Sequence, residues 1–451
     1  MNLKTVKHIY FLGIGGIGMS ALARYFNFEG KQIAGYDRTE TPLTDQLQLE
    51  GIQIHFEDSI ALIPKETELI IYTPAIPKEN KEFQYLQNSD IPMLKRSEIL
   101  GEISKDYFTI AIAGTHGKTT ITSMVAHILK YNGLAVNAFI GGIASNFESN
   151  LVLSNDANIM VVEADEFDRS FLTLHPDLAI ISSMDADHLD IYHNANYLKE
   201  SFFLFSEQIK TGGWLISQKR LEVAPKFKGK LIAYSASETT DYHATNIHYK
   251  DGRTHFSLQK EAQLISEFNL LLPGIHNVEN ATAAIIACST YGLEMAQIAD
   301  ALKSYLGVKR RFEFIIRQDN LIMIDDYAHH PEEIKASLQA ARSLFPNKKI
   351  TGVFQPHLFS RTRDFMDDFA QSLSLLDELI LLDIYPAREK PIEGVSSASL
   401  LEKVNLESKH LWSKDELAEN IDQMEIEVLI MMGAGDIDRL MKPVKEKLLN
   451  K

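Results

Sequence analysis

Short apolar runs alternate with longer amphipathic stretches along most of the chain. An apolar run of about four to eight residues bounded by turn residues predicts a buried strand, and apolar residues at helical spacing predict a helix. Because the two kinds of segment alternate, the pattern predicts an α/β fold with parallel sheets. The first such runs lie at residues 8–14, 31–37, 68–76, 107–114, 157–165 and 177–184.

Helical periodicity fills several intervals between these runs. The stretches over residues 18–30 and 115–133 end at Gly30 and Gly133, and a third over residues 277–292 closes at Gly292. Glycine directly after a periodic stretch is typical of a helix end. Residues 211–272 are more polar and contain strand-like pieces such as residues 252–259.

A second group of strand-like runs begins after the segment "GVKRRFEF" at residues 307–314. These runs are separated by helical intervals and lie at residues 320–331, 348–357, 377–386 and 426–435. We therefore expect three α/β domains, over residues 1–105, 106–309 and 310–451.

Length and composition agree with this organisation. A chain of 451 residues exceeds the size of one ordinary hydrophobic core. Its formal net charge of −16 disfavours binding to a phosphate backbone, so we expect no nucleic-acid partner. Cys288 is the only cysteine, which suits a reducing, cytoplasmic location. No run approaches the roughly 18 apolar residues of a membrane-spanning helix, so we expect no membrane insertion.

A glycine fingerprint follows the first predicted strand. Gly13, Gly15 and Gly18 form the pattern GxGxxG, which is typical of a turn that binds a dinucleotide or another diphosphate. Asp37 ends the next predicted strand, where an acid can bind a ribose hydroxyl. The pattern fits NAD and other nucleoside diphosphates alike, and Asp37 can also be a simple turn residue.

A second phosphate loop, "AGTHGKTT", spans residues 113–120 between a predicted strand and a predicted helix. Its glycines let backbone N–H groups converge on phosphate oxygens, Lys118 can reach the terminal phosphates, and Thr119 can ligate Mg²⁺. The general pattern requires glycine where this chain has Ile112, so the loop is a variant. Two such loops indicate two phosphorylated ligands.

Acidic residues follow the next two predicted strands. Glu163, with Asp165 and Glu166 close by, suits Mg²⁺ ligation near a triphosphate, although a solvated acidic turn has the same composition. His188, flanked by Asp187 and Asp190, is a candidate for a second metal site.

Further candidates lie in the second half of the chain. Asn277 and Asn280 stand one helical turn apart and can pair with an adenine edge, although Asn277 can also be a helix N-cap. Strand-end loops contain basic residues and histidines that suit phosphate or carboxylate binding, with surface charge as the alternative. These are Lys309, Arg310, Arg311, His329, His330, His357, Arg361 and Arg363, and the acidic residues Asp325 and Asp326 precede the two adjacent histidines after the same predicted strand.

Taken together, the motifs resemble those of the Mur ligases, and in particular the branch that adds L-alanine to UDP-N-acetylmuramate. The resemblance covers nearly the whole chain in order, through "GIGGIGMS", "AGTHGKTT", "EADE", "DHLD", "HNVENATAA", "RRFE", "DDYAHHP" and "FQPHLFSRTRDF". It implies a Rossmann-like N-terminal domain, a central P-loop ATPase domain and a Rossmann-like C-terminal domain. It also implies ATP and Mg²⁺ as cofactors. We further expect a monomer or a homodimer.

The resemblance assigns roles to individual residues. It implies a catalytic set of Lys118, His188, His329, His357 and Arg361, and a metal set of Thr119, Glu163 and His188. The UDP-sugar would lie on Gly13, Gly15, Gly16, Gly18, Met19, Ser20 and Asp37. The ATP set is Gly114, Thr115, His116, Gly117, Lys118, Thr119, Thr120, Asn277, Asn280, Arg311 and Asp326. His357 and Arg361 would hold the alanine carboxylate, and His329 or His330 is a candidate for the amine proton.

One position departs from sister Mur ligases, which carry a carbamylated lysine about fifteen residues after the metal-site histidine. Here that position is Phe203, and Lys199 is out of register; the L-alanine-adding branch is similar in lacking the lysine. The alternatives are a recycling ligase that adds a tripeptide to the same sugar, an NAD-dependent oxidoreductase and a non-enzymatic ATP switch. The last two each leave one phosphate loop without a use.

Overall fold

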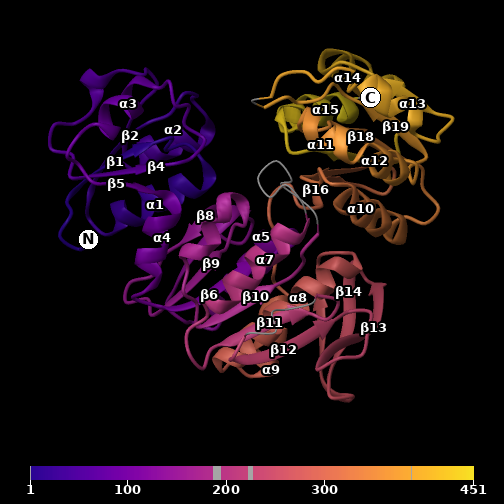
Figure 1. The fold of residues 1–451 in the computed structure, drawn as a ribbon. Helices are drawn as coiled ribbons and strands as arrows, with labels where there is room; N and C mark the ends of the chain where they lie inside the picture. Colours follow the sequence, from indigo (N-terminus) through magenta and orange to yellow (C-terminus); the bar gives the residue numbers. More distant parts are fainter. Residues whose placement is uncertain (1, 186–194, 222–226, 388, 451) are drawn as a thin grey trace. The chain divides into compact units, whose positions relative to one another are not determined.

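The computed structural model describes residues 2–185, 195–221, 227–387 and 389–450. It contains three β-sheets with helices, which confirms the α/β class (Figure 1). The chain divides into two compact units. The first comprises residues 1–245, 257–268 and 279–305, and the second comprises residues 246–256, 269–278 and 306–451.

The first sheet is parallel, with the Rossmann-like strand order β3-β2-β1-β4-β5. Its strands are β1 His8–Leu12, β2 Gln32–Tyr36, β3 Gln53–His55, β4 Leu69–Tyr72 and β5 Met93–Lys95. Its helices are α1 Ile17–Phe28, α2 Pro42–Leu49, η1 Ile60–Leu62, α3 Lys81–Gln87 and α4 Arg96–Ser104. The carboxyl ends of parallel strands meet at one edge, so the loops after β1, β2 and β5 share that edge.

The central sheet has ten strands in the order β15-β14-β13-β12-β11-β10-β6-β9-β7-β8. They are β6 Phe108–Ala113, β7 Val136–Ala144, β8 Ser149–Val152, β9 Ile159–Glu163, β10 Leu178–Ile181, β11 Trp214–Gln218, β12 Lys230–Ser235, β13 Tyr242–Lys250, β14 Arg253–Lys260 and β15 Gln263–Leu270. The helices of this region are α5 Lys118–Tyr131, η2 Phe167–Thr173, α7 Ala195–Glu207, α8 Ile275–Tyr291 and α9 Met295–Leu302.

The third sheet has the order β16-β17-β21-β18-β19-β20, with β16 antiparallel to β17. Its strands are β16 Glu313–Arg317, β17 Ile322–Asp326, β18 Ile350–Phe354, β19 Glu378–Leu381, β20 Lys409–Leu411 and β21 Val428–Met432. Its helices are α10 Pro331–Leu344, α11 Phe359–Asp364, α12 Met366–Leu373, α13 Ser397–Lys403, α14 Lys414–Asn420, η3 Ile421–Gln423, η4 Asp436–Leu440 and α15 Met441–Leu449.

Hydrophobic packing joins the first sheet to the central one. Phe11 of β1 and Leu22 of α1 belong to the same buried cluster as Phe139 of β7 and Met160 of β9. Burial of this shared apolar surface stabilises the two sheets as one unit. The third sheet has separate apolar clusters on its two faces, one including Leu338 of α10 and the other Val444 of α15.

Membrane insertion was not expected from the sequence. Among the described residues, the structure contains no helix with both the length and the apolar character that crossing a bilayer requires.

Candidate active site

The first glycine loop lies at the carboxyl edge of the first sheet, between β1 and α1. Gly13 has φ of +85°, a conformation that favours glycine, and a Cβ there would lie 2.6 Å from Thr73 Cγ2. The backbone N–H of Gly15 donates to Asp37 Oδ2 over 2.8 Å. Asp37 therefore braces the loop in this structure, and its predicted contact with a ribose remains a prediction.

The start of α1 is tied to the central sheet. Ser20 Oγ donates to the Ile17 carbonyl oxygen over 2.9 Å, and Asn150 Nδ2 of β8 donates to Ser20 Oγ over 3.1 Å. Met19 and Ser20 are both buried. The structure thus gives Met19 and Ser20 a packing role, while their predicted role in sugar binding stays a prediction. Of the two remaining loop glycines, Gly16 precedes α1 as its N-cap and Gly18 lies in the first turn of α1.

The second phosphate loop lies between β6 and α5, as the sequence predicts. Gly114 and Gly117 have φ of +135° and +84°, so the loop curls through conformations that disfavour other residues. Ser182 and Ser183, directly after β10, brace it: the His116 N–H donates to Ser183 Oγ over 2.7 Å, and Ser182 Oγ donates to the His116 carbonyl oxygen.

Other loop residues are held by the same strand end. The Thr115 and Ser183 hydroxyls lie 2.9 Å apart, and His116 Nε2 lies 3.5 Å from Asp185 Oδ2. Thr115 and Thr120 are buried. This bracing fixes the loop from outside its own sequence.

Lys118 is the first residue of α5 and is held by three acceptors. Its Nζ donates to the Gly114 carbonyl oxygen over 2.7 Å and to Glu166 Oε1 and Oε2 over 2.9 and 2.7 Å. Burial opposes the charged ammonium, but the negative charges of Glu166, Asp165 and Glu163 outweigh it, so the pKa of Lys118 is raised. Lys118 therefore stays cationic, and a phosphate that approaches it competes with Glu166.

Glu163, at the end of β9, lies beside Thr119. Thr119 Oγ1 donates to Glu163 Oε1 over 3.2 Å, and the Gly141 N–H donates to Glu163 Oε2 over 2.8 Å. Burial raises the pKa of Glu163, with Asp165 adding to the rise and Lys118 opposing it. A carboxylate and a hydroxyl that meet next to a phosphate loop are oxygen donors of the kind that Mg²⁺ prefers, so these two residues fit the metal.

The second metal-site candidate, His188, lies outside the described residues, as do Asp187 and Asp190. Within the part of the chain that the structure describes, no three His, Cys, Asp or Glu side chains are grouped so as to hold a metal ion by themselves. Any metal held by Glu163 and Thr119 thus needs further ligands, for which substrate phosphates and water are the usual source.

The two asparagines of α8 have different surroundings. A Cβ on Gly117 would lie 2.5 Å from Asn280 Oδ1, so Asn280 faces the phosphate loop. Asn277 Nδ2 donates to the Pro273 carbonyl oxygen over 2.7 Å, and α8 begins at Ile275. The alternative interpretation of Asn277 as an N-cap is therefore wrong, because the helix starts two residues earlier.

In the second unit, Arg311 and His329 meet around Tyr327 and Glu333. The Arg311 guanidinium lies 5.0 Å from the centre of the Tyr327 ring, and Arg311 Nη1 lies 3.6 Å from Glu333 Oε1. His329 Nδ1 lies 3.2 Å from Glu333 Oε2 and 3.0 Å from the Tyr327 carbonyl oxygen. Glu333, in the first turn of α10, therefore contacts both Arg311, which is expected to bind an ATP phosphate, and His329, which is expected to be catalytic.

His357 joins the same cluster. Its ring lies 6.1 Å from that of His329 and stacks on Tyr385 at 5.7 Å. Arg361 lies in α11 and is buried. His330 is the N-cap of α10, its ring packs 4.8 Å from Phe365, and it is buried. Of the two histidines considered for the amine proton, His329 is thus the one in the cluster with His357.

Asp325 and Asp326 end β17. Burial raises the pKa of Asp326 to about 6. Burial raises the pKa of Asp325 to about 7, and the nearby charges of Asp326, Glu313 and Asp438 add to the rise while Arg310 opposes it. Arg310 Nε lies 3.6 Å from Asp325 Oδ2. Asp325 therefore favours its protonated form far more in the folded state than in the unfolded chain.

This shift predicts a pH-dependent stability. Because the folded pKa of about 7 exceeds the ordinary value of 3.8, the stabilisation is complete below pH 3.8 and is lost as the pH rises through 7. The Asp325→Asn substitution removes this dependence. At each pH we take the melting temperature of the variant minus that of wild type. We expect this difference to be more positive at pH 8 than at pH 5, by about 5 °C or more. Exposed Asp319→Asn is the control, and parallel profiles for Asp325→Asn and wild type would contradict the assignment.

The sequence did not single out several residues at these positions, namely Ser182, Ser183, Tyr327, Glu333, Tyr385 and Arg96, whose Nη2 lies 3.6 Å from Asp165 Oδ2. Ser182 and Ser183 could have been noted because they follow a predicted strand beside the phosphate loop. Nothing local distinguishes the other four from ordinary surface residues.

Comparison with known proteins agrees with this geometry. Residues 8–108 match the description "Mur ligase family, catalytic domain", residues 112–288 match "Mur ligase middle domain", and residues 310–437 match "Mur ligase, glutamate ligase domain". The chain belongs to the Mur ligase family.

Relatives match along the whole length. The UDP-N-acetylmuramate–L-alanine ligase of Christiangramia forsetii is 48% identical, with 100% of this chain and 99% of the relative covered. That of Parabacteroides distasonis is 46% identical, with 99% and 98% covered. The crystal structure of the UDP-N-acetylmuramate–alanine ligase of Thermotoga maritima superposes with a TM-score of 0.85 at 28% identity, covering 99% of both chains.

Proposed function

We propose that this chain is an ATP-dependent ligase that joins L-alanine to the lactyl carboxylate of UDP-N-acetylmuramate in peptidoglycan precursor synthesis. The observation that carries the proposal is the pair of phosphate loops at the ends of β1 and β6 within one compact unit. Full-length relatives with that activity in their names support the choice of substrates. The tripeptide-adding alternative has weaker support, because the murein peptide ligase of Psychrobacter arcticus is similar at 24% identity and therefore shows only the fold.

The proposal divides the work among three domains. Residues 1–105 bind the UDP-sugar on Gly13, Gly15, Gly16 and Gly18. Residues 106–309 bind ATP, and residues 310–451 bind the amino acid. Asn277, Arg311 and Asp326 are assigned to ATP as well.

ATP is needed because a carboxylate does not react with an amine at neutral pH. The lactyl carboxylate attacks the γ-phosphorus of ATP, forming an acyl phosphate and releasing ADP. Lys118, kept cationic by its acidic neighbours, stabilises the negative charge on the transferring group. The neutral amine of alanine then attacks the acyl carbon, and inorganic phosphate leaves with the oxygen it took from the carboxylate.

Thr119 and Glu163 are the described residues that would hold Mg²⁺, which supplies charge neutralisation at the phosphates. His188 is proposed as a further ligand. The hydrogen bond from the Gly141 N–H orients Glu163 toward Thr119, so the site is arranged by this chain's own backbone.

The second half-reaction uses the cluster in the second unit. His357 and Arg361 are proposed to bind the alanine carboxylate, for which a guanidinium is well suited. His329 is positioned by Glu333 and is proposed to accept the proton that the amine loses.

An assay of phosphate release tests the function. Purified enzyme with ATP, Mg²⁺ and UDP-N-acetylmuramate is expected to release phosphate when L-alanine is added. Phosphate release is expected to stay at background when the murein tripeptide replaces L-alanine. It is also expected to stay at background when NADH is added without an amino acid. Release that depends on the tripeptide instead of alanine would support the recycling ligase, and release with no UDP-sugar would favour an ATP switch.

A further inference from the structure

The first glycine loop lacks positive charge of its own. Residues 13–20 contain no lysine or arginine, and the Asp37 carboxylate accepts the Gly15 N–H. A diphosphate on this loop meets backbone N–H groups and the start of α1, but it also lies near a fixed negative charge. A cation from elsewhere in the fold would offset this negative charge and strengthen diphosphate binding.

Arg96 provides that cation. It is the first residue of α4 and follows β5, so it lies at the same edge of the sheet as the glycine loop. A Cβ added to Gly18 would lie 2.7 Å from Arg96 Nη1, which places the guanidinium against the loop. The start of α4 is fixed by the Lys95 N–H, which donates to Glu98 Oε2 over 2.7 Å.

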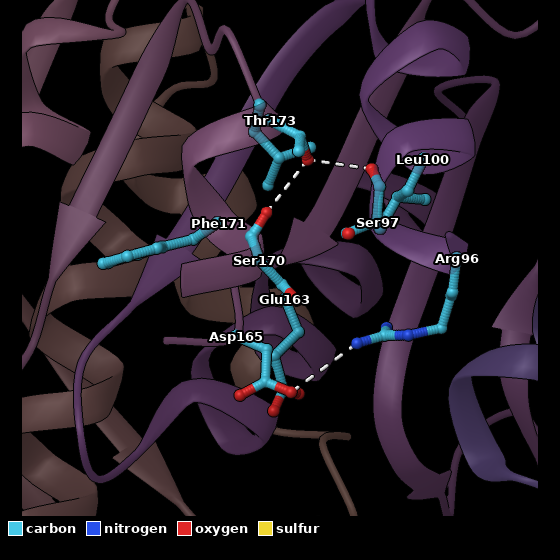
Figure 2. A pocket seen from close by; sticks show the side chains of 9 residues that line it. Arg96, Ser97, Leu100, Glu163, Asp165, Ser170, Phe171 and Thr173 are labelled. Atoms are coloured by element: carbon cyan, nitrogen blue, oxygen red, sulfur yellow. Dashed lines mark hydrogen bonds and ion pairs between the residues drawn. The ribbon is translucent and has the colours of Figure 1, made fainter. Parts of the chain in front are cut away.

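Arg96 also faces the central sheet. Its Nη2 lies 3.6 Å from Asp165 Oδ2, and both residues line a pocket with Glu163 (Figure 2). The side chains of Arg96 and Asp165 are 24% and 39% exposed. Ion pairs this accessible and this long contribute little to stability, so Asp165 is a partner that a phosphate can replace.

We propose that Arg96 binds the diphosphate of the UDP-sugar above the first glycine loop, and that Asp165 holds the guanidinium there until the substrate arrives. The inference rests on the proposed function for the identity of the ligand. Arginine suits this position because its planar guanidinium can donate two parallel hydrogen bonds to phosphate oxygens.

Calorimetric titration with UDP-N-acetylmuramate and with UDP tests the proposal. In Arg96→Gln, we expect the Kd for both ligands to rise about ten- to a hundred-fold, as is typical for loss of a charged hydrogen-bonding partner. The Kd for ATP should change by less than roughly threefold, because Lys118 and its loop are intact. Lys105→Gln is the matched control: it removes the same charge from the C-terminal end of α4, where Lys105 pairs with Glu102.

The variant Asp165→Asn distinguishes a role of Arg96 in ligand binding from a purely structural role in its ion pair with Asp165. If Arg96 served only to join α4 to the central sheet, both substitutions would weaken UDP binding alike. The proposal instead predicts that Asp165→Asn leaves UDP binding unchanged or tighter. Arg96→Lys keeps the positive charge but loses the two parallel hydrogen-bond donors of the guanidinium. Its Kd for UDP should therefore lie between those of wild type and Arg96→Gln. This variant serves as the test if Arg96→Gln does not fold.

Failure of the proposed function and failure of the proposed role of Arg96 give different results. If wild-type protein binds neither UDP nor UDP-N-acetylmuramate, the proposed function itself is wrong. If wild type binds both and Arg96→Gln binds them equally well, or if Asp165→Asn weakens binding as much as Arg96→Gln, the function stands and the role of Arg96 is overturned.

Discussion

Substituting Lys118 with alanine is expected to lower kcat by at least about a thousand-fold, the usual cost of removing a charge that stabilises a transferring phosphoryl group. The Kd for UDP-N-acetylmuramate should change by less than roughly threefold, because the sugar binds on a different loop. Steady-state phosphate release and calorimetry measure the two effects. Lys130→Ala is the control, since Lys130 lies on the same helix and is exposed.

The substitution has a structural cost that must be separated from the catalytic one. Lys118 neutralises Glu166, whose side chain is only 1% exposed, so removal of Lys118 alone leaves a buried carboxylate without its main cation. The double variant Lys118→Ala with Glu166→Gln removes both charges. We expect it to melt several degrees above the single variant while remaining inactive. Recovery of activity together with stability, or loss of UDP-sugar binding in the folded double variant, would count against the assignment.

Gly117→Ala is expected to raise the Kd for ATP by at least about a hundred-fold. Gly117 has φ of +84°, and a Cβ there would lie 2.5 Å from Asn280 Oδ1, so alanine both strains the backbone and displaces Asn280. The phosphate loop then cannot keep its shape, although binding of the UDP-sugar should be retained. Calorimetry with ATP measures the loss.

Gly133→Ala is the matched control for this glycine. Gly133 follows the other end of α5 and also has a positive φ, of +77°, but a Cβ there meets nothing within 4 Å. Alanine at this position carries a backbone strain of about 1 kcal/mol without a clash. Equal loss of ATP binding in both variants would show that a general loss of stability, and not the shape of the phosphate loop, lowers the affinity.

The buried parallel strands were the most predictable elements. Residues 107–114 and 177–184 were predicted as strands and contain β6 Phe108–Ala113 and β10 Leu178–Ile181, because strands covered on both faces are continuously apolar. Strand β7 Val136–Ala144 was not among the predicted runs, since Gly141 and Gly142 interrupt its apolar pattern. Helix α8 was predicted to start at residue 277 but starts at Ile275, since local sequence fixes helix boundaries poorly.

The candidate site was predictable as motifs but not as contacts. The phosphate loop and Glu163 stood out because their residue types follow strands. The bracing of His116 by Ser183 joins positions 67 residues apart, and the contact of Arg96 with the glycine loop depends on where β5 pairs in the sheet. Glu333 looked like an ordinary acidic residue in the first turn of a helix. Such pairings arise from the tertiary fold, which no local pattern encodes.

The central claim is that ATP and the UDP-sugar, bound on separate loops, react with each other. Its most direct test uses UDP-N-acetylmuramate with ¹⁸O in both oxygens of the lactyl carboxylate, together with unlabelled ATP and L-alanine. Mass spectrometry of the released phosphate is predicted to find one ¹⁸O atom per phosphate, carried over through the acyl phosphate. Phosphate released at the same rate without any label would contradict the account.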